Sequence, residues 1–166
     1  MDLFMNKVLL DKDNEKVDIE SRLANKVVGL YFSASWCPPC KQFTPLLCKL
    51  CTELAQQKVA TFEVVFISFD KNEAEMDSYR EEQGEWLALP FKDPYIEELK
   101  EKYKVTSIPK LVIVKTNGDV ITHTGRKDVQ DQGVKCVKHW TDMAFISESK
   151  SKTITKEQNK EIEDTV

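Results

Sequence analysis

The chain has 166 residues, of which 41% are hydrophobic and 31% are charged, with a formal net charge of -4. This length and hydrophobic content fit a single folded domain, and the acidic balance gives no electrostatic reason to expect a nucleic acid or an anionic membrane as a partner. No stretch reaches the roughly 18 apolar residues of a membrane span, and the first ten residues lack the pattern of a secretory signal. An odd number of cysteines, five, favours a reducing compartment over a disulfide framework, so we expect a cytoplasmic protein, with the nucleus as a second location.

The N-terminal part of the chain predicts a short hairpin and then a buried strand. The apolar segments Val8–Leu10 and Val17–Ile19 flank a polar turn, as in a hairpin of two short strands. Ser21–Leu23 predicts a helical turn. Val27–Ser33 is apolar on both faces, which is typical of a central strand covered by helices on each side. We expect this strand to be the spine of a sheet.

A helix is expected soon after that strand. Apolar residues recur there at spacings of three and four, which places them on one stripe; they are Phe43, Leu46, Leu47, Leu50, Cys51 and Leu54. Pro38 and Pro39 suit the start of a helix, where a missing N–H group costs little. Pro45 should kink the helix, which we expect to end near Gln57.

The middle of the chain alternates between strand and helix patterns. Phe62–Phe69 predicts a second buried strand, and Glu73–Gln83, with Gly84 behind it, predicts a charged surface helix. Strands that alternate with helices imply a parallel crossover. Trp86–Phe91 is an apolar connection, and Pro94–Tyr103 predicts a helix with a proline at its start.

The C-terminal part predicts an antiparallel sheet edge and a covering helix. Leu111–Val114 and Val120–Ile121 are apolar segments joined by the tight-turn signal Thr116–Asp119. These strands would make the sheet mixed. Val134–Ala144 has the spacing of an amphipathic helix that covers one face.

The composition divides the chain into two parts. From residue 147 onward the sequence is rich in Ser, Lys, Thr, Glu, Gln and Asn and has few aliphatic residues. We therefore expect one α/β domain over residues 1–146, with a mixed sheet between helices, and a disordered polar tail over residues 147–166.

Two cysteines lie where the first long helix should begin. A helix N-terminus stabilises a thiolate, so Cys37 is the candidate nucleophile for thiol–disulfide exchange. Cys40 lies one turn further on, close enough to form a disulfide, and is the candidate resolving thiol. Because Pro38 and Pro39 have no N–H to donate to the thiolate, we expect the pKa of Cys37 to be lowered only moderately, as in a reductant.

A C-x-x-C motif by itself is also compatible with a zinc site or with two buried thiols. Cys48 and Cys51 form a second such motif, which raises the alternative of a four-cysteine metal site. Cys40 and Cys51, however, would be about 16 Å apart on one continuous helix, too far for a single ion. We expect no metal, and we expect Cys48 and Cys51 to be packing residues, with a regulatory thiol or a metal ion bridging two chains as the alternatives. Cys136 is expected to be an unpaired thiol.

The segment Trp36–Cys40, together with Ser107–Leu111, resembles the thioredoxin superfamily. A finer pattern resembles its tryparedoxin and nucleoredoxin branch, and most closely the nucleoredoxin-like proteins of the rod-derived cone viability factor type. The segments that carry this resemblance are Tyr31–Cys40, Asn25–Val28, Phe43–Pro45, Phe62–Phe66, Trp86–Phe91, Ile108–Lys115, Gly118–Val120 and Gly125–Lys127.

The resemblance implies a thioredoxin fold, a three-layer α/β/α arrangement around a mixed sheet. It implies a cis-proline at Pro109 packed against the disulfide, main-chain pairing of Ile108 with an extended substrate, and a substrate platform that includes Trp36. We therefore expect the substrate-binding residues to be Trp36, Pro38, Pro39, Ile108 and Pro109. Tyr31 departs from the pattern of thioredoxins proper, which carry a buried aspartate at this position, so the obvious general base for Cys40 is absent and water or a carboxylate elsewhere would have to serve.

The expected function is reduction of protein disulfides by the Cys37–Cys40 dithiol, in redox homeostasis or signalling. The partners would be protein disulfides and an upstream thiol reductant, with no tightly bound cofactor and a monomeric chain. The alternative is a redox-sensitive binding module with little turnover, in which the oxidation state of the two cysteines controls association with a partner.

Overall fold

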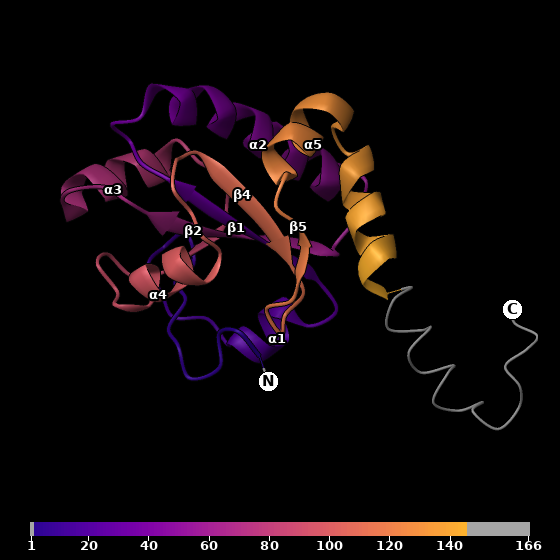
Figure 1. Cartoon of the computed structure of the whole chain (residues 1–166), viewed down its shortest axis with the longest axis horizontal. Helices are drawn as coiled ribbons and strands as arrows, with labels where there is room; N and C mark the ends of the chain where they lie inside the picture. The colour runs from indigo at the N-terminus through magenta and orange to yellow at the C-terminus, as the bar shows by residue number, and fades with distance from the viewer. Residues whose placement is uncertain (1, 146–166) are drawn as a thin grey trace, which may run out of the picture.

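A computed structural model describes residues 2–145 of the chain. The strands span Val27–Ser33 (β1), Phe62–Ser68 (β2), Leu87–Ala88 (β3), Lys110–Val114 (β4) and Val120–Thr122 (β5). The helices span Ile19–Leu23 (α1), Pro38–Gln56 (α2), Glu73–Glu81 (α3), Tyr95–Lys102 (α4) and Gly125–Gln132 (α5), and a further helix covers residues 135–145. The strands form one sheet in the order β3-β2-β1-β4-β5 (Figure 1).

The sheet is mixed, as predicted. β1 runs parallel to β2, and β2 runs parallel to β3, whereas β4 is antiparallel to both β1 and β5. All seven residues of β1 are buried, so this strand is the spine of the sheet. No helix among residues 2–145 is long and apolar enough to cross a membrane.

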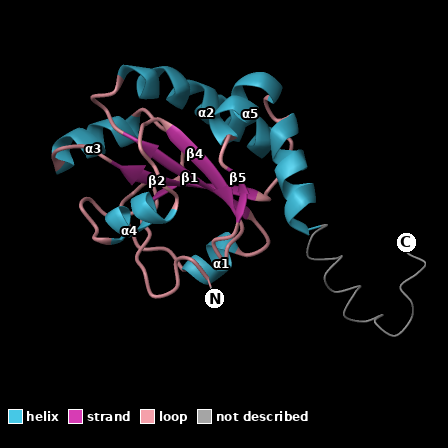
Figure 2. Cartoon of the chain, viewed as in Figure 1, coloured by secondary structure: helices cyan, strands magenta, loops and turns pink. Residues whose placement is uncertain are grey.

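Helices cover both faces of the sheet, which gives three layers (Figure 2). One core cluster joins β1, β2 and β4 to α2, α3, α5 and the helix over residues 135–145; its large members include Phe43, Leu47, Phe66, Tyr79 and Trp140. The other cluster joins the opposite face to α1, α4 and the N-terminal segment; its members include Phe4, Leu9, Leu30, Phe32 and Leu99. The predicted three-layer α/β/α thioredoxin fold is confirmed.

The long helix α2 was placed correctly, but its buried stripe was not predicted in full. The helix continues through Pro45 to Gln56, and its buried residues are Cys40, Phe43, Thr44, Leu47, Leu50 and Leu54. Leu46, which we expected on the stripe, is 43% exposed. Neighbouring helix positions are about 100° apart, so Leu46 turns away when Leu47 faces the core. Thr44 occupies the stripe instead, and this matters for the site.

The N-terminal hairpin prediction was confirmed only in part: the chain turns back so that Leu10 pairs with Lys16 in antiparallel fashion, and the N–H of Val17 donates to the carbonyl of Leu9, but no regular strands form there. Leu10 forms isolated bridges with Lys16 and with Ala88, and the flanking residues do not extend these into strands. The Leu10–Ala88 bridge places the N-terminal segment beside β3, whose two residues lie within the apolar connection predicted at Trp86–Phe91. The Leu10–Ala88 bridge and the pairing of β3 with β2 join residues that are far apart in the sequence, so the local sequence does not encode them.

The C-terminal part contains a helix that the sequence pattern did not predict. α5 has only two buried residues, Gly125 and Val129, so its apolar periodicity is weak. A Cβ atom at Gly125 would lie 2.8 Å from the carbonyl oxygen of Leu111, so this glycine lets α5 approach β4 closely. The predicted amphipathic helix follows over residues 135–145. The predicted tail, residues 147–166, and the domain boundary before it lie outside the described residues.

Candidate active site

Cys37 and Cys40 form a disulfide at the N-terminus of α2, beyond the end of β1. Cys37 is the N-cap residue, and its Sγ accepts a hydrogen bond from the N–H of Cys40 at 3.3 Å. The Cα atoms of the two cysteines are 5.2 Å apart. Cys37 keeps 5% of its surface exposed, whereas Cys40 is fully buried. Pro38 and Pro39 occupy the first two helical positions, and both are exposed. The two sulfur-bearing residues therefore differ in exposure: Cys37 keeps a small exposed surface, and Cys40 has none.

The segment before β4 reaches the same place from far along the chain. The carbonyl oxygen of Ile108 lies 3.7 Å from the Sγ of Cys37, although the two residues are 71 positions apart. The Ile108–Pro109 peptide bond is cis, as the resemblance implies, and Pro109 is buried. Within the described part of the chain, neither the N–H nor the carbonyl of Ile108 is bonded to another main-chain group. This main-chain edge is therefore free to pair with an extended peptide.

The loop between β1 and α2 is anchored to the loop after β2. The indole N–H of Trp36 donates to the carbonyl oxygen of Phe69 at 3.0 Å, and the Trp36 side chain is 50% exposed. Ser35 donates to Oδ1 of Asp70 from its main-chain N–H at 2.7 Å and from its hydroxyl at 2.6 Å. Ser68 donates to Oδ2 of the same carboxylate at 2.8 Å. These bonds fix Trp36 beside Cys37.

A cluster of buried hydroxyl groups lies beneath Cys40. The Thr44 hydroxyl donates to the carbonyl oxygen of Cys40 at 3.0 Å. It has only one proton, so it accepts from the hydroxyls of Tyr31 at 2.7 Å and Tyr79 at 2.6 Å. The Tyr79 oxygen in turn accepts from the hydroxyl of Ser33 at 2.8 Å. Burial, with a smaller contribution from neighbouring Tyr79, raises the pKa of Tyr31 well above its usual range, so this hydroxyl stays protonated.

This cluster occupies the region where we noted the missing aspartate. Among the residues described, no carboxylate lies within hydrogen-bonding distance of Cys40. Sequence reasoning noticed Tyr31 but missed Thr44, Tyr79 and Ser33. A signal was present for Thr44, because it lies four residues after Cys40 and three before Leu47, on the apolar stripe of α2. A hydroxyl at such a position predicts a buried hydrogen bond.

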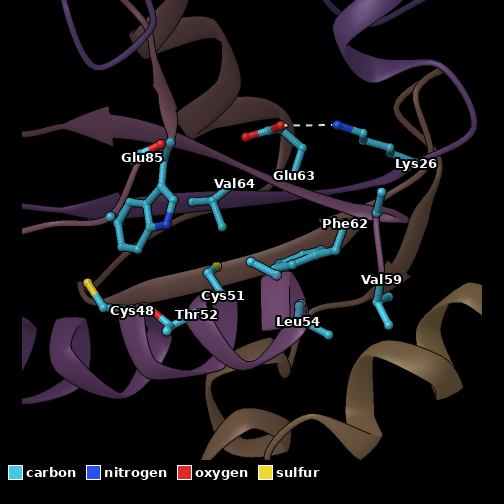
Figure 3. A pocket seen from close by; sticks show the side chains of 14 residues that line it. Lys26, Cys48, Cys51, Thr52, Leu54, Val59, Phe62, Glu63, Val64 and Glu85 are labelled. Atoms are coloured by element: carbon cyan, nitrogen blue, oxygen red, sulfur yellow. Dashed lines mark hydrogen bonds and ion pairs between the residues drawn. The ribbon is translucent and has the colours of Figure 1, made fainter. Parts of the chain in front are cut away.

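The second C-x-x-C motif lies apart from the first. Cys48 and Cys51 line a cavity of about 510 Å³ together with Phe62, Glu63 and residues of the segment before β3. Figure 3 shows both cysteines on α2, with the ion pair of Glu63 and Lys26 at 3.4 Å on another wall. Burial raises the pKa of Cys51 to about 12. Over residues 2–145, no group of three or more His, Cys, Asp or Glu side chains is arranged to hold a metal ion.

Comparisons with known proteins agree with this geometry. A sequence model of the thioredoxin-like family matches residues 25–120. Tryparedoxin from Trypanosoma brucei brucei is 43% identical over 117 residues, which cover 70% of this chain and 78% of the relative. Probable nucleoredoxin 1 from Arabidopsis thaliana is 36% identical over 154 residues, which cover 93% of this chain but 26% of that longer protein.

A solved structure gives the same result. Thioredoxin from Wuchereria bancrofti superposes with a TM-score of 0.74 at 42% identity, and the match covers 84% of this chain and 97% of that one. The chain therefore belongs to the thioredoxin-like family, with nucleoredoxins, nucleoredoxin-like protein 1 and tryparedoxins among its relatives, and its Cys37–Cys40 disulfide is a redox-active pair of that family.

Proposed function

We propose that this protein is a thiol–disulfide oxidoreductase that reduces disulfides in other proteins. The observation that carries the proposal is the unequal pair at the start of α2: Cys37, the N-cap residue, keeps 5% of its surface exposed, whereas Cys40, in the first turn, has none exposed. A nucleophile must reach a substrate sulfur, and a resolving thiol must reach only the nucleophile. Cys37 is thus the attacking thiol and Cys40 the resolving thiol.

The reaction proceeds in two exchanges. The thiolate of reduced Cys37 attacks one sulfur of the substrate disulfide, and the other substrate sulfur leaves with the bonding electron pair and takes up a proton. Cys40 then loses its proton and attacks the Sγ of Cys37, which releases the second substrate thiol. The dithiol has given two electrons and has become the Cys37–Cys40 disulfide. An external thiol reductant restores the dithiol by the reverse exchange.

The surroundings of Cys37 suit a peptide substrate. The free main-chain edge at Ile108 can pair with an extended segment, which would bring a substrate sulfur close to Cys37. The exposed indole of Trp36 offers an apolar surface at one side of the thiol, and the exposed rings of Pro38 and Pro39 offer another.

The test is reduction of insulin disulfides with dithiothreitol as the electron donor. Wild type should accelerate the reaction, and Cys37→Ser should return it to the uncatalysed rate. Cys48→Ser is the matched control, because it removes a partly buried thiol from the same helix, and it should keep the wild-type rate. A chain that acts only as a redox-sensitive binding module would show little turnover and little loss in Cys37→Ser, and this result would contradict the proposal.

A trapping experiment separates the roles of the two cysteines. In Cys40→Ser the first exchange can occur but the second cannot, so a mixed disulfide with the substrate should accumulate on Cys37. Mass spectrometry of the trapped species identifies the protein cysteine and its partners. Accumulation on Cys48, Cys51 or Cys136 instead would refute the assignment.

A further inference from the structure

The side chain of Trp36, the residue before Cys37, contacts the main chain of Phe69 in the loop after β2. Trp36 is half exposed, and its indole N–H holds the carbonyl of Phe69, which is partly exposed. Phe69 and Ile108 are both partly buried and pack against the same core cluster. We call Trp36 and Phe69 the aromatic platform.

A lysine ammonium group lies over each ring of the platform. The Nζ of Lys71 lies 5.8 Å from the centroid of the Trp36 ring, and the Nζ of Lys100, from α4, lies 5.4 Å from that of Phe69. Both distances are within the range in which a ring holds a cation over its face. In the described part of the chain neither lysine forms an ion pair, whereas Lys41, just after the Cys37–Cys40 pair, is paired with Glu82 at 3.4 Å.

Asp70, the carboxylate next to Lys71 in the sequence, forms no ion pair with either lysine. Asp70 precedes Lys71, but it is only 7% exposed, and both of its oxygens accept hydrogen bonds from Ser35 and Ser68. The chain as a whole is acidic, with a net charge of -4, whereas the two lysines over Trp36 and Phe69 are cations without an ion-pair partner in the described part of the chain. Unpaired cations at a rim attract carboxylates and repel other cations.

We infer that the platform selects disulfide substrates whose reacting cysteine is flanked by Asp or Glu. This inference rests on the proposed function and narrows its substrate class. An extended peptide paired with Ile108 would pass the platform, where its neighbouring side chains meet Lys71 and Lys100. Two lysines on an acidic chain fit an acidic peptide and give too little positive charge for a nucleic acid backbone.

The test uses three peptides that differ only in the two residues on each side of one cysteine: Glu, Gln or Lys. Each cysteine carries a 2-nitro-5-thiobenzoate group through a disulfide. When the Cys37 thiolate attacks the peptide sulfur, that disulfide breaks and the coloured thionitrobenzoate leaves with the electron pair, so the second-order rate constant is read directly. For reduced wild type we expect the Glu peptide to react about fivefold faster than the Gln peptide, from two exposed ion pairs of ordinary strength.

Two variants of the full chain isolate the platform. Lys71→Glu/Lys100→Glu should reverse the order of the Glu and Lys peptides, with each rate taken relative to that of the Gln peptide in the same variant. Lys102→Glu is the matched control, because Lys102 lies on α4 too but sits 5.6 Å from the ring of Tyr103, whose hydroxyl bonds Gly118 in the turn after β4. Lys102→Glu should keep the wild-type order of the rate constants for the three peptides. In 1 M salt the preference should shrink toward one, because the screening length falls to about 3 Å.

The outcomes separate this inference from the proposed function. Equal rates for the three peptides, or an equal effect of Lys102→Glu, would overturn the charge preference while the reaction itself stands. If no peptide reacts, the proposed function fails, and binding then decides the inference. For this purpose the same peptides, with serine in place of cysteine, are titrated into oxidised protein while the Trp36 indole N–H is followed by NMR. Tightest binding of the Glu peptide supports the preference, and equal binding refutes it.

Discussion

The hydroxyl cluster beneath Cys40 can be tested by the substitution Thr44→Val. This change keeps the β-branched shape and removes a hydroxyl that is 2% exposed and takes part in three hydrogen bonds. In this variant the Tyr31 hydroxyl still lies 3.5 Å from the carbonyl oxygen of Cys40, and the Tyr79 hydroxyl keeps its hydrogen bond with the hydroxyl of Ser33. The substitution therefore removes three buried hydrogen bonds, and the remaining contacts of Tyr31 and Tyr79 compensate in part.

The expected cost follows from these contacts. A hydrogen bond of this kind contributes about 1 kcal/mol net, and a buried polar group left without a good partner costs about 1–3 kcal/mol. We expect Thr44→Val to lower the free energy of unfolding by about 2–4 kcal/mol, which corresponds to roughly 4–16 °C in Tm for a chain of this size. Urea unfolding of the oxidised protein, followed by circular dichroism, measures the change.

The matched control is Thr52→Val, the same substitution at an exposed position on the same helix. It should change the stability by no more than about 0.5 kcal/mol. A double-mutant cycle with Tyr79→Phe should show a coupling energy of at least about 0.5 kcal/mol, because the two side chains share a bond. Equal effects of Thr44→Val and Thr52→Val, or strict additivity in the cycle, would refute the assigned network.

Two further predictions concern the remaining thiols. After reduction, iodoacetamide at pH 8 should label Cys37 first, and it should label Cys51 and Cys136 only upon unfolding. Burial raises the pKa of Cys51 and of Cys136 to about 12, so at pH 8 only about one in ten thousand of these thiols is a thiolate. Peptide mapping that finds Cys51 labelled in the folded protein would contradict this prediction. These two raised values also imply that stability is unchanged below about pH 8 and falls as the pH rises toward 12, since the unfolded chain releases thiol protons that the folded chain keeps. The urea midpoint should therefore be lower at pH 9.5 than at pH 7.5, and the drop should be smaller in Cys51→Ala/Cys136→Ala; an equal drop would argue against the two thiols as its cause.

Several elements could be predicted from the sequence because their signals are local. The bounds of β1 matched the structure, since Val27–Ser33 is a short, nearly continuous apolar run, which is typical of a strand buried on both faces. α2 was placed by its apolar spacing and its two initial prolines. β3 and the Leu10–Ala88 bridge were not predicted, because Leu87 and Ala88 become a strand only by pairing with β2, and Leu10 and Ala88 are far apart in the sequence. α5 was missed because only Gly125 and Val129 face its neighbours.

The same division applies to the site. The motif at Cys37 and Cys40, with the helix that follows, determined the chemistry, because a dithiol at a helix N-terminus is a local arrangement. The tertiary structure alone decided what surrounds it. Folding brings the Ile108 carbonyl to 3.7 Å from Cys37 and buries Cys40 completely.

Folding also gives ordinary polar residues a role at the site. It joins Thr44 of α2 to Tyr79 of α3, which are 35 residues apart. It sets Lys100 of α4 over Phe69, beside Trp36. Spacing within one helix or strand specifies which face a residue occupies, whereas contacts between elements depend on how the layers pack. The sequence therefore determined the reactive pair, and the packing of three layers decided its partners, its accessibility and the charge around it.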